Sequence, residues 1–243
     1  MHGPLLGEFM GTLVLILLGD GVVANVLLKK SKGENSGWMV IATGWGLAVV
    51  AAIFTAIAFG SPGAHINPAI TLTVAFLSGD WSNVGQFWAA QILGGFAGAT
   101  LVWMTYLPHW RVTPDPGAKL GIFCTGPAIR HLPANLLTEI IATTCLIVVG
   151  FSFGSNAVSP SGLPPGFGPW LWGVLVWAIG LSLGGPTGYA MNPARDFGPR
   201  LAHAVLPISE KGNSDWGYAF VPIVGPLIAG GIGAAIIKAV GIR

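Results

Sequence analysis

The pattern of apolar residues along the chain predicts several membrane-spanning helices. Six long apolar stretches cover residues 5–28, 38–59, 84–106, 133–153, 169–185 and 217–237. A hydrocarbon core about 30 Å thick requires roughly 17–25 helical residues, so each stretch is long enough to cross it. Two further apolar stretches, 67–77 and 192–206, are too short. Eleven helical residues span about 16 Å, half a bilayer, so these two stretches predict re-entrant half-helices.

The order of these segments repeats along the chain. Each half contains two spans, a half-helix and a third span, and short sequences match between the halves. "LLGEFMGT" parallels "LLTEIIAT", and "HINPA" parallels "AMNPA". The offset is 131 residues from Glu8 to Glu139 and 125 residues from Asn67 to Asn192. This nearly constant offset indicates an internal duplication.

Three spans in each repeat is an odd number, so the second repeat begins on the opposite side of the membrane. The half-helices then enter from opposite faces and their tips meet near the midplane. The predicted fold class is an all-α membrane protein with six transmembrane helices and two re-entrant half-helices in an inverted repeat. The expected boundaries within the single domain 1–243 are 1–106 for the first repeat, 107–132 for a connecting loop and 133–243 for the second repeat.

Each predicted half-helix begins with the same three residues. They are Asn67, Pro68 and Ala69 in the first, and Asn192, Pro193 and Ala194 in the second. Asn is a preferred N-cap and Pro a preferred first helical residue. We expect each Asn oxygen to face its own helix and each amide NH₂ to point outward. Each helix dipole adds about half a positive charge at its tip, which repels cations and protons but admits neutral molecules.

Composition supports a membrane protein and excludes several function classes. The chain is 53% hydrophobic and only 8% charged, and its net charge of +2 gives no basic surface for nucleic acid. No pairing of a nucleophile with a base and no cluster of metal ligands stands out, so we expect neither an enzyme nor a cofactor.

These motifs resemble the aquaporin superfamily of major intrinsic proteins. The match includes the two Asn-Pro-Ala triplets, "GEF" and "GT" in the first span, "TE" and "AT" in the fourth, and "GAHINPA". The resemblance covers essentially the whole chain. It implies a single channel domain that assembles as a homotetramer in the lipid bilayer of a cell membrane, with one pore in each subunit.

Four residues are implied as the selectivity filter. The resemblance places Trp45, Gly180, Tyr189 and Arg195 there. A cation in an apolar segment is costly unless it faces a cavity, which independently favours Arg195. The set of two aromatic residues, a Gly and an Arg resembles the filter of the bacterial glycerol facilitator branch. The missing side chain at Gly180 makes room for a polyol, which agrees with this resemblance. Facilitators typically have Phe in place of Tyr189, and its hydroxyl could narrow the pore or supply a second polar contact.

Other residues are given roles by the resemblance or by their chemistry. The markers of the facilitator branch are Tyr106, Asp196, Arg200, Pro226 and Leu227. His65 is expected to line the pore, to anchor its loop, or both. Glu8 and Glu139 are buried carboxylates that need partners, so we expect them to hold the re-entrant loops rather than to transfer protons. Asp20 is placed in the outer vestibule.

The expected function is a passive channel for glycerol and other small uncharged solutes, with some water. The alternatives are a strict water channel, a facilitator of lactic acid, dihydroxyacetone, urea or hydrogen peroxide, and a coupled secondary transporter. The resemblance puts both termini in the cytoplasm. The positive-inside rule favours the reverse, because most cations follow an odd number of spans. They are Lys29, Lys30, Lys32, Arg111, Lys119, Arg130, Arg195, Arg200 and Lys211, against Lys238 and Arg243 on the terminal side.

Overall fold

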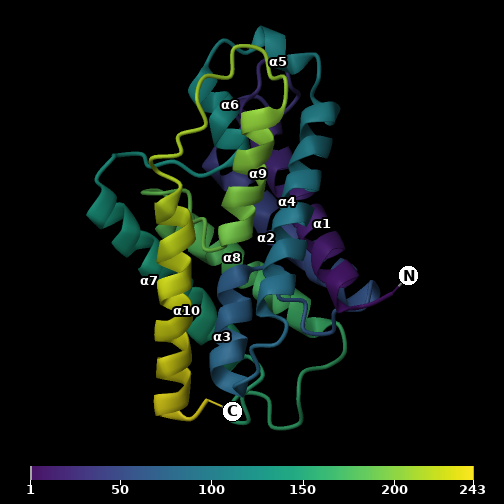
Figure 1. Ribbon diagram of the computed structural model, residues 1–243, viewed down its shortest axis with the longest axis vertical. Coiled ribbons are helices and arrows are strands. Elements are labelled where there is room, and N and C mark those ends of the chain that lie inside the picture. The colour runs from purple at the N-terminus through teal and green to yellow at the C-terminus, as the bar shows by residue number, and fades with distance from the viewer. Residues whose placement is uncertain (1, 243) are drawn as a thin grey trace.

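The computed structural model describes residues 2–242 as a bundle of helices joined by loops (Figure 1). Five helices are long and apolar enough to cross a membrane. They are α1 (Pro4–Leu27), α2 (Trp38–Ala58), α4 (Val84–Thr105), α7 (Leu132–Ser152) and α10 (Phe220–Val240). The fifth predicted span, 169–185, corresponds to α8 (Phe167–Leu183), which has 17 residues and lies at the lower limit for a crossing. All six predicted spans are therefore helices, with boundaries shifted by a few residues.

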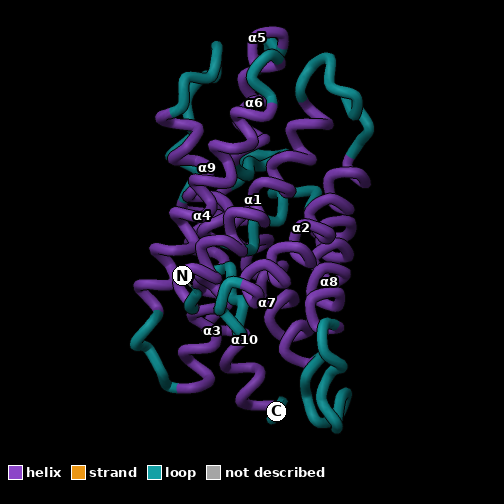
Figure 2. Tube along the Cα trace, turned by 90° about the vertical axis from the view of Figure 1, so that its right-hand side faces the viewer, coloured by secondary structure: helices purple, strands orange, loops and turns teal. Residues whose placement is uncertain are grey.

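The two predicted half-helices are also present. They are α3 (Pro68–Ser78) with 11 residues and α9 (Pro193–Val205) with 13 residues. In Figure 1 they lie in opposite halves of the molecule, and the loops that lead into them meet near its middle. Both termini lie in the half of the molecule away from α5 (His109–Val112) (Figures 1 and 2).

The helices pack in a pattern that relates the two halves of the chain. In the first half α1 packs against α2 and α4, and in the second α7 packs against α8 and α10. The halves meet where α2 lies beside α8 (Figure 2). Each half-helix contacts a long helix of the other half, because α3 lies against α10 and α9 lies against α4. The half-helices therefore interlock the two repeats.

Small residues let these helices approach closely, as is usual where membrane helices pack. A Cβ atom added at Gly173 of α8 would lie 2.6 Å from the carbonyl oxygen of Gly46 in α2 and 2.3 Å from a methyl of Val50. Between α1 and α4, a Cβ at Gly94 would lie 2.3 Å from the carbonyl oxygen of Phe9. Only a residue without a side chain fits at these two crossings.

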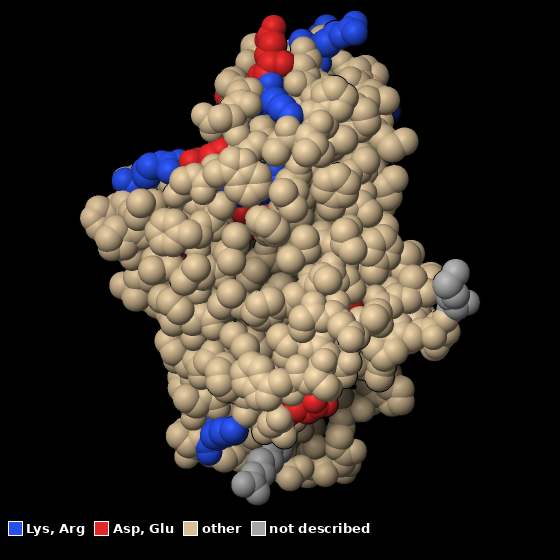
Figure 3. All heavy atoms as spheres, viewed as in Figure 1, with Lys and Arg blue, Asp and Glu red and all other residues tan. Residues whose placement is uncertain are grey.

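The segment 107–132 contains two short helices, so it is not irregular throughout. They are α5 and α6 (Pro116–Phe123), and the side chain of Asp115 caps α6 by accepting a hydrogen bond from the Gly117 N–H at 2.8 Å. Lys119 is fully buried and donates to the carbonyls of Ser209 and Glu210, in the loop after α9. Most charged residues visible in Figure 3 lie toward the two ends of the molecule, and the broad band between them is almost entirely uncharged.

The α2–α8 crossing gives a first prediction. Gly173→Ala should destabilise the detergent-solubilised protein by about 1–3 kcal/mol, because the new methyl overlaps Gly46 and Val50. Gly21→Ala in α1 is the matched control, since no atom of another described segment lies within 4 Å of its added Cβ. Ala is the better helix former there by about 1 kcal/mol. Thermal unfolding checks both variants, and an unchanged midpoint for Gly173→Ala would contradict the close crossing.

Candidate functional site

The tips of α3 and α9 are built alike. Asn67 and Asn192 are the N-caps, each followed by a Pro at the first helical position. The side-chain oxygen of each Asn accepts a hydrogen bond from the N–H two residues later, at 2.8 Å in α3 and 3.0 Å in α9. This bond fixes the amide plane, so the NH₂ group of each Asn is directed away from its own helix.

The sequence predicts that each amide NH₂ points outward. In the structure each NH₂ also has a hydrogen-bond partner in the other half of the chain. Asn67 Nδ2 donates to the carbonyl of Met191 at 2.9 Å, and Asn192 Nδ2 donates to the carbonyl of Ile66 at 2.8 Å. Each half-helix is thus bonded to the loop that leads into the other. An amide NH₂ has two hydrogens, so each Asn keeps one donor for a solute.

Glu8 of α1 holds the loop before α3. Its Oε1 accepts from the Ser61 hydroxyl at 2.6 Å and the His65 N–H at 2.8 Å, and its Oε2 accepts from the Ile66 N–H at 2.6 Å. Gln91 of α4 donates to Oε2 at 2.8 Å. Ile66 has φ of 43°, a left-handed conformation that is rare for a β-branched residue. These bonds stabilise both the buried carboxylate and the strained loop.

Glu139 of α7 makes the equivalent contacts before α9. Its Oε1 accepts from the Thr187 hydroxyl at 2.6 Å and the Ala190 N–H at 3.0 Å, and its Oε2 accepts from the Met191 N–H at 2.9 Å. Tyr189 and Met191 have φ of 39° and 50°. Hydrogen bonds to a charged acceptor are about twice as strong as neutral ones, which suits a loop that must hold residues in the left-handed region.

A cavity of about 430 Å³ lies around the meeting point of the tips. Residues from both halves of the chain line it. Those that carry polar or aromatic groups include Trp45, His65, Asn67, Tyr189, Asn192 and Arg195. His65 lies 3.2 Å from the Thr71 hydroxyl through Nδ1, while its backbone N–H donates to Glu8. His65 therefore both borders the cavity and belongs to the bonded loop.

Arg195 and Trp45 form the cationic and aromatic part of the cavity wall. The Arg195 Cζ lies 4.3 Å from the centroid of the Trp45 ring, a cation–π distance. Arg195 Nη1 is 3.5 Å from the carbonyl of Phe123, the last residue of α6. Gly19 of α1 permits this position of Trp45, because a Cβ there would lie 2.3 Å from the ring.

The open space expected at Gly180 is filled by Tyr189. A Cβ at Gly180 would lie 2.7 Å from Tyr189 Cζ and 2.8 Å from its hydroxyl oxygen. Trp38 packs edge-on against Tyr189 at 5.8 Å and donates to the Gly180 carbonyl at 2.9 Å. The Tyr189 hydroxyl is buried and has no partner among residues 2–242, so in this conformation it offers the cavity no polar contact. Gly180 acts on the cavity through Tyr189.

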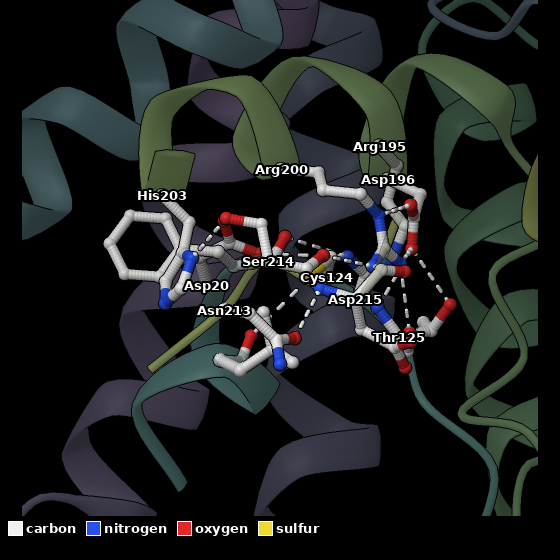
Figure 4. Close-up of polar contacts among 12 residues, drawn as sticks. Asp20, Cys124, Thr125, Arg195, Asp196, Arg200, His203, Asn213, Ser214 and Asp215 are labelled. Carbon is white, nitrogen blue, oxygen red and sulfur yellow. Dashed lines mark hydrogen bonds and ion pairs between the residues drawn. The ribbon is translucent and has the colours of Figure 1, made fainter. Parts of the chain in front are cut away.

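Asp196 and Arg200 form a buried ion pair inside α9 (Figure 4). Arg200 donates to the two Asp196 oxygens at 2.7 and 3.0 Å, and also to the carbonyls of Thr125 and Ser214. Asp196 accepts from the N–H and the hydroxyl of Thr125 at 2.8 and 2.9 Å. The pair fixes α9 to the segments before α7 and after α9, and it lies away from the cavity wall.

The remaining expected residues lie outside the cavity lining. Tyr106 donates to the Gly21 carbonyl at 3.3 Å and joins the end of α4 to α1. Pro226 and Leu227 are inside α10, and Pro226 is buried. Asp20 is not in an outer vestibule, because it is fully buried 3.8 Å from Arg195 Nη1.

Lys211 holds the C-terminal end of α9. Its ammonium donates to the carbonyls of His203, Ala204 and Leu206 at 2.6, 2.8 and 2.7 Å. A cation at a helix C-terminus is favoured by the helix dipole. Burial lowers the pKa of the Lys211 ammonium, since the neutral form needs less solvation.

Two contributors were missed from the sequence. Gln91 supports Glu8, and the Phe123 carbonyl approaches Arg195. Gln91 is a polar residue well inside the apolar stretch 84–106, and this position was a signal that it has a buried partner. Nothing in the local sequence indicates that a particular backbone carbonyl approaches Arg195.

The fold and the cavity define a polytopic membrane protein in which two half-helices meet beside an internal cavity. A family model described as "Major intrinsic protein" matches residues 2–237, and the chain belongs to this family.

Comparison with curated relatives and solved structures places the chain further. A probable glycerol uptake facilitator of Thermotoga maritima is 60% identical over 232 residues, covering 95% of this chain and 96% of that protein. A glycerol uptake facilitator of Bacillus subtilis is 49% identical, covering 96% and 83%. The X-ray structure of the aquaglyceroporin from Plasmodium falciparum is similar, with a TM-score of 0.85 and 26% identity over 98% of this chain and 95% of that chain. The chain is an integral membrane protein of the aquaglyceroporin branch.

The carboxylate contacts give a second prediction. Glu139→Gln should lower the unfolding free energy by about 3 kcal/mol or more, because an amide leaves one buried N–H without an acceptor and weakens the other bonds. Glu8→Gln should do the same in the other half. Glu34→Gln is the control, since Glu34 bonds Lys29 and Lys30 in an exposed turn. Thermal unfolding in detergent is the measurement. Midpoints for Glu8→Gln and Glu139→Gln that match Glu34→Gln would show that the carboxylates do not stabilise the loops.

Proposed function

We propose that the chain is a passive channel through which glycerol and other small uncharged solutes, with some water, diffuse across a cell membrane. One observation carries this proposal: an aromatic face and a guanidinium, Trp45 and Arg195, stand together in the wall of a cavity that also contains both Asn amides. A polyol has a CH backbone that suits the aromatic face and hydroxyls that accept from Arg195 and from the amides. The relatives described as glycerol uptake facilitators support the same solute.

The same site explains how charge is kept out. The N-terminal ends of α3 and α9 both face the cavity, and each contributes about half a positive charge. Arg195 adds a guanidinium to the cavity wall. A cation or a migrating proton is therefore repelled, whereas a neutral solute replaces its lost water contacts with the Asn and Arg donors. Glu8 and Glu139 accept several hydrogen bonds each, which supports a structural role over proton transfer.

We infer that Asn67, Pro68, Ala69 and their counterparts Asn192, Pro193 and Ala194 form the narrow centre of the pore. The proposed filter consists of Trp45, Tyr189 and Arg195. Gly180 contributes to it indirectly, because its missing side chain leaves space for the Tyr189 ring. The segments 1–106 and 133–243 are the proposed repeats of one channel domain. A strict water channel is disfavoured because Gly180 lets the Tyr189 ring withdraw against α8. A coupled transporter would need an ion-binding or titratable group at the tips, where the two amides lie instead.

We further propose that both termini are cytoplasmic, although most cations lie on the other side. Four of those cations are engaged inside the protein: Lys119 and Lys211 bond carbonyls, Arg200 pairs with Asp196, and Arg195 faces the cavity. Cations that are bonded or buried inside the protein in this way contribute little to the orientation of the chain in the membrane. The exposed apolar side chains of the long helices suit a lipid bilayer and neighbouring subunits of a homotetramer.

The proposed function predicts a solute-driven recovery of volume. Liposomes that contain the purified protein should shrink in a glycerol gradient and then reswell, at a rate linear in concentration and independent of proton or sodium gradients. Urea, lactic acid and water are run in parallel to rank solutes. Water shrinkage without glycerol reswelling would favour a water channel, and saturating, gradient-dependent uptake would favour a coupled transporter.

The contact between Gly180 and Tyr189 predicts how the filter can be narrowed. Gly180→Ala should reduce glycerol flux more than water flux, because the new methyl displaces the Tyr189 ring toward the cavity. Glycerol is the larger solute and is obstructed first. Gly185→Ala is the matched control, since no other described atom lies within 4 Å of its added Cβ. Equal loss of both fluxes in Gly180→Ala would contradict this role of Gly180.

A further inference from the structure

Asp20 is a buried carboxylate for which neither the fold nor the pore centre has an evident use. It lies in α1 with no exposed surface, and neither of its oxygens has a hydrogen-bond partner within residues 2–242. An ionised carboxylate in such a place is very costly unless an opposite charge is near. The nearest opposite charge is Arg195, whose Nη1 is 3.8 Å from Asp20 Oδ1.

Other charged groups near Asp20 are already engaged. Asp196 and Arg200, on the same helix as Arg195, satisfy each other and Thr125 (Figure 4). Once that pair is set aside, Asp20 and Arg195 are the carboxylate and the cation that face each other here among the described side chains. Their separation is that of an ion pair but exceeds a direct hydrogen bond, so the attraction is one of charge.

The pair sets where the Arg195 guanidinium lies. Arg195 has one long contact with the Phe123 carbonyl at 3.5 Å and stacks on the face of Trp45, so few bonds hold this flexible side chain. Asp20 is not part of the cavity wall, whereas Arg195 and Trp45 are. Asp20 therefore lies outside the cavity wall, on the far side of Arg195, and it attracts the guanidinium toward α1 and over Trp45.

We propose that Asp20 is a positioning residue that determines the selectivity of the filter. Its charge keeps Arg195 at the edge of the cavity, which leaves width for a polyol while the guanidinium still donates to it. The inference rests on the proposed function of the channel. Without the carboxylate, Arg195 is free to extend across the cavity toward Tyr189, which obstructs glycerol more than water.

The test is the ratio of glycerol to water permeability in liposomes, which does not depend on how much protein is inserted. Asp20→Asn should lower this ratio about threefold or more, the lower end of coupling between contacting residues. Asp20→Glu keeps the charge and should restore part of the ratio. Thr12→Val is the matched control, because Thr12 is also fully buried in α1 but bonds only the Glu8 carbonyl; its ratio should equal that of the unmodified protein.

A double-mutant cycle separates positioning from a general structural role. Asp20 acts through Arg195, so Asp20→Asn should have no further effect on the ratio in an Arg195→Gln background. An unchanged ratio in Asp20→Asn, or an equal fall in both backgrounds, would overturn the proposal. If Asp20→Asn does not fold, Asp20→Ser gives the same comparison with a smaller neutral side chain. Absence of glycerol flux in the unmodified protein would instead overturn the proposed function, and the ratio of urea to water would then test Asp20.

Discussion

The buried carboxylates of Glu8 and Glu139 are the constraint on which the centre of the molecule depends. Glu8 binds the N–H of Ile66, and the carbonyl of Ile66 accepts from Asn192 of the other half. Glu139 binds the N–H of Met191, and the carbonyl of Met191 accepts from Asn67. Each carboxylate thereby fixes the amide at the opposite tip. Two loops with left-handed residues would not hold this geometry by their own backbone preference.

The two arginines of α9 show how neighbouring cations take different roles. Arg200 is enclosed by Asp196 and backbone carbonyls, so its charge is neutralised and its function is to fix α9. Arg195 has few bonds and reaches the cavity beside Trp45. A donor that is not saturated by the protein remains available to a solute. The arrangement that keeps Arg195 undersaturated also makes its position depend on Asp20.

Sequence reasoning located the helices, the half-helices and their N-caps, because apolar length and Asn-Pro spacing are local signals. It did not locate the partners of the Asn amides, since the bonds from Asn67 to Met191 and from Asn192 to Ile66 join segments more than a hundred residues apart. It predicted open space at Gly180, but a Gly indicates only that a side chain is missing. The occupant of that space, Tyr189, is set by the tertiary fold. The place of Asp20 was missed for the same reason.

In the proposed channel, Trp45, Arg195 and the two Asn amides together bind a small polyol as it crosses the cavity. The most direct measurement is an experimental structure of the protein in a membrane mimetic that contains glycerol. We expect glycerol with its carbon chain on Trp45, with hydroxyls within hydrogen-bonding distance of Arg195, and with further density beside Asn67 and Asn192. A glycerol-soaked structure whose cavity is closed between Arg195 and Tyr189, or whose Asn amides turn away from the passage, would contradict it.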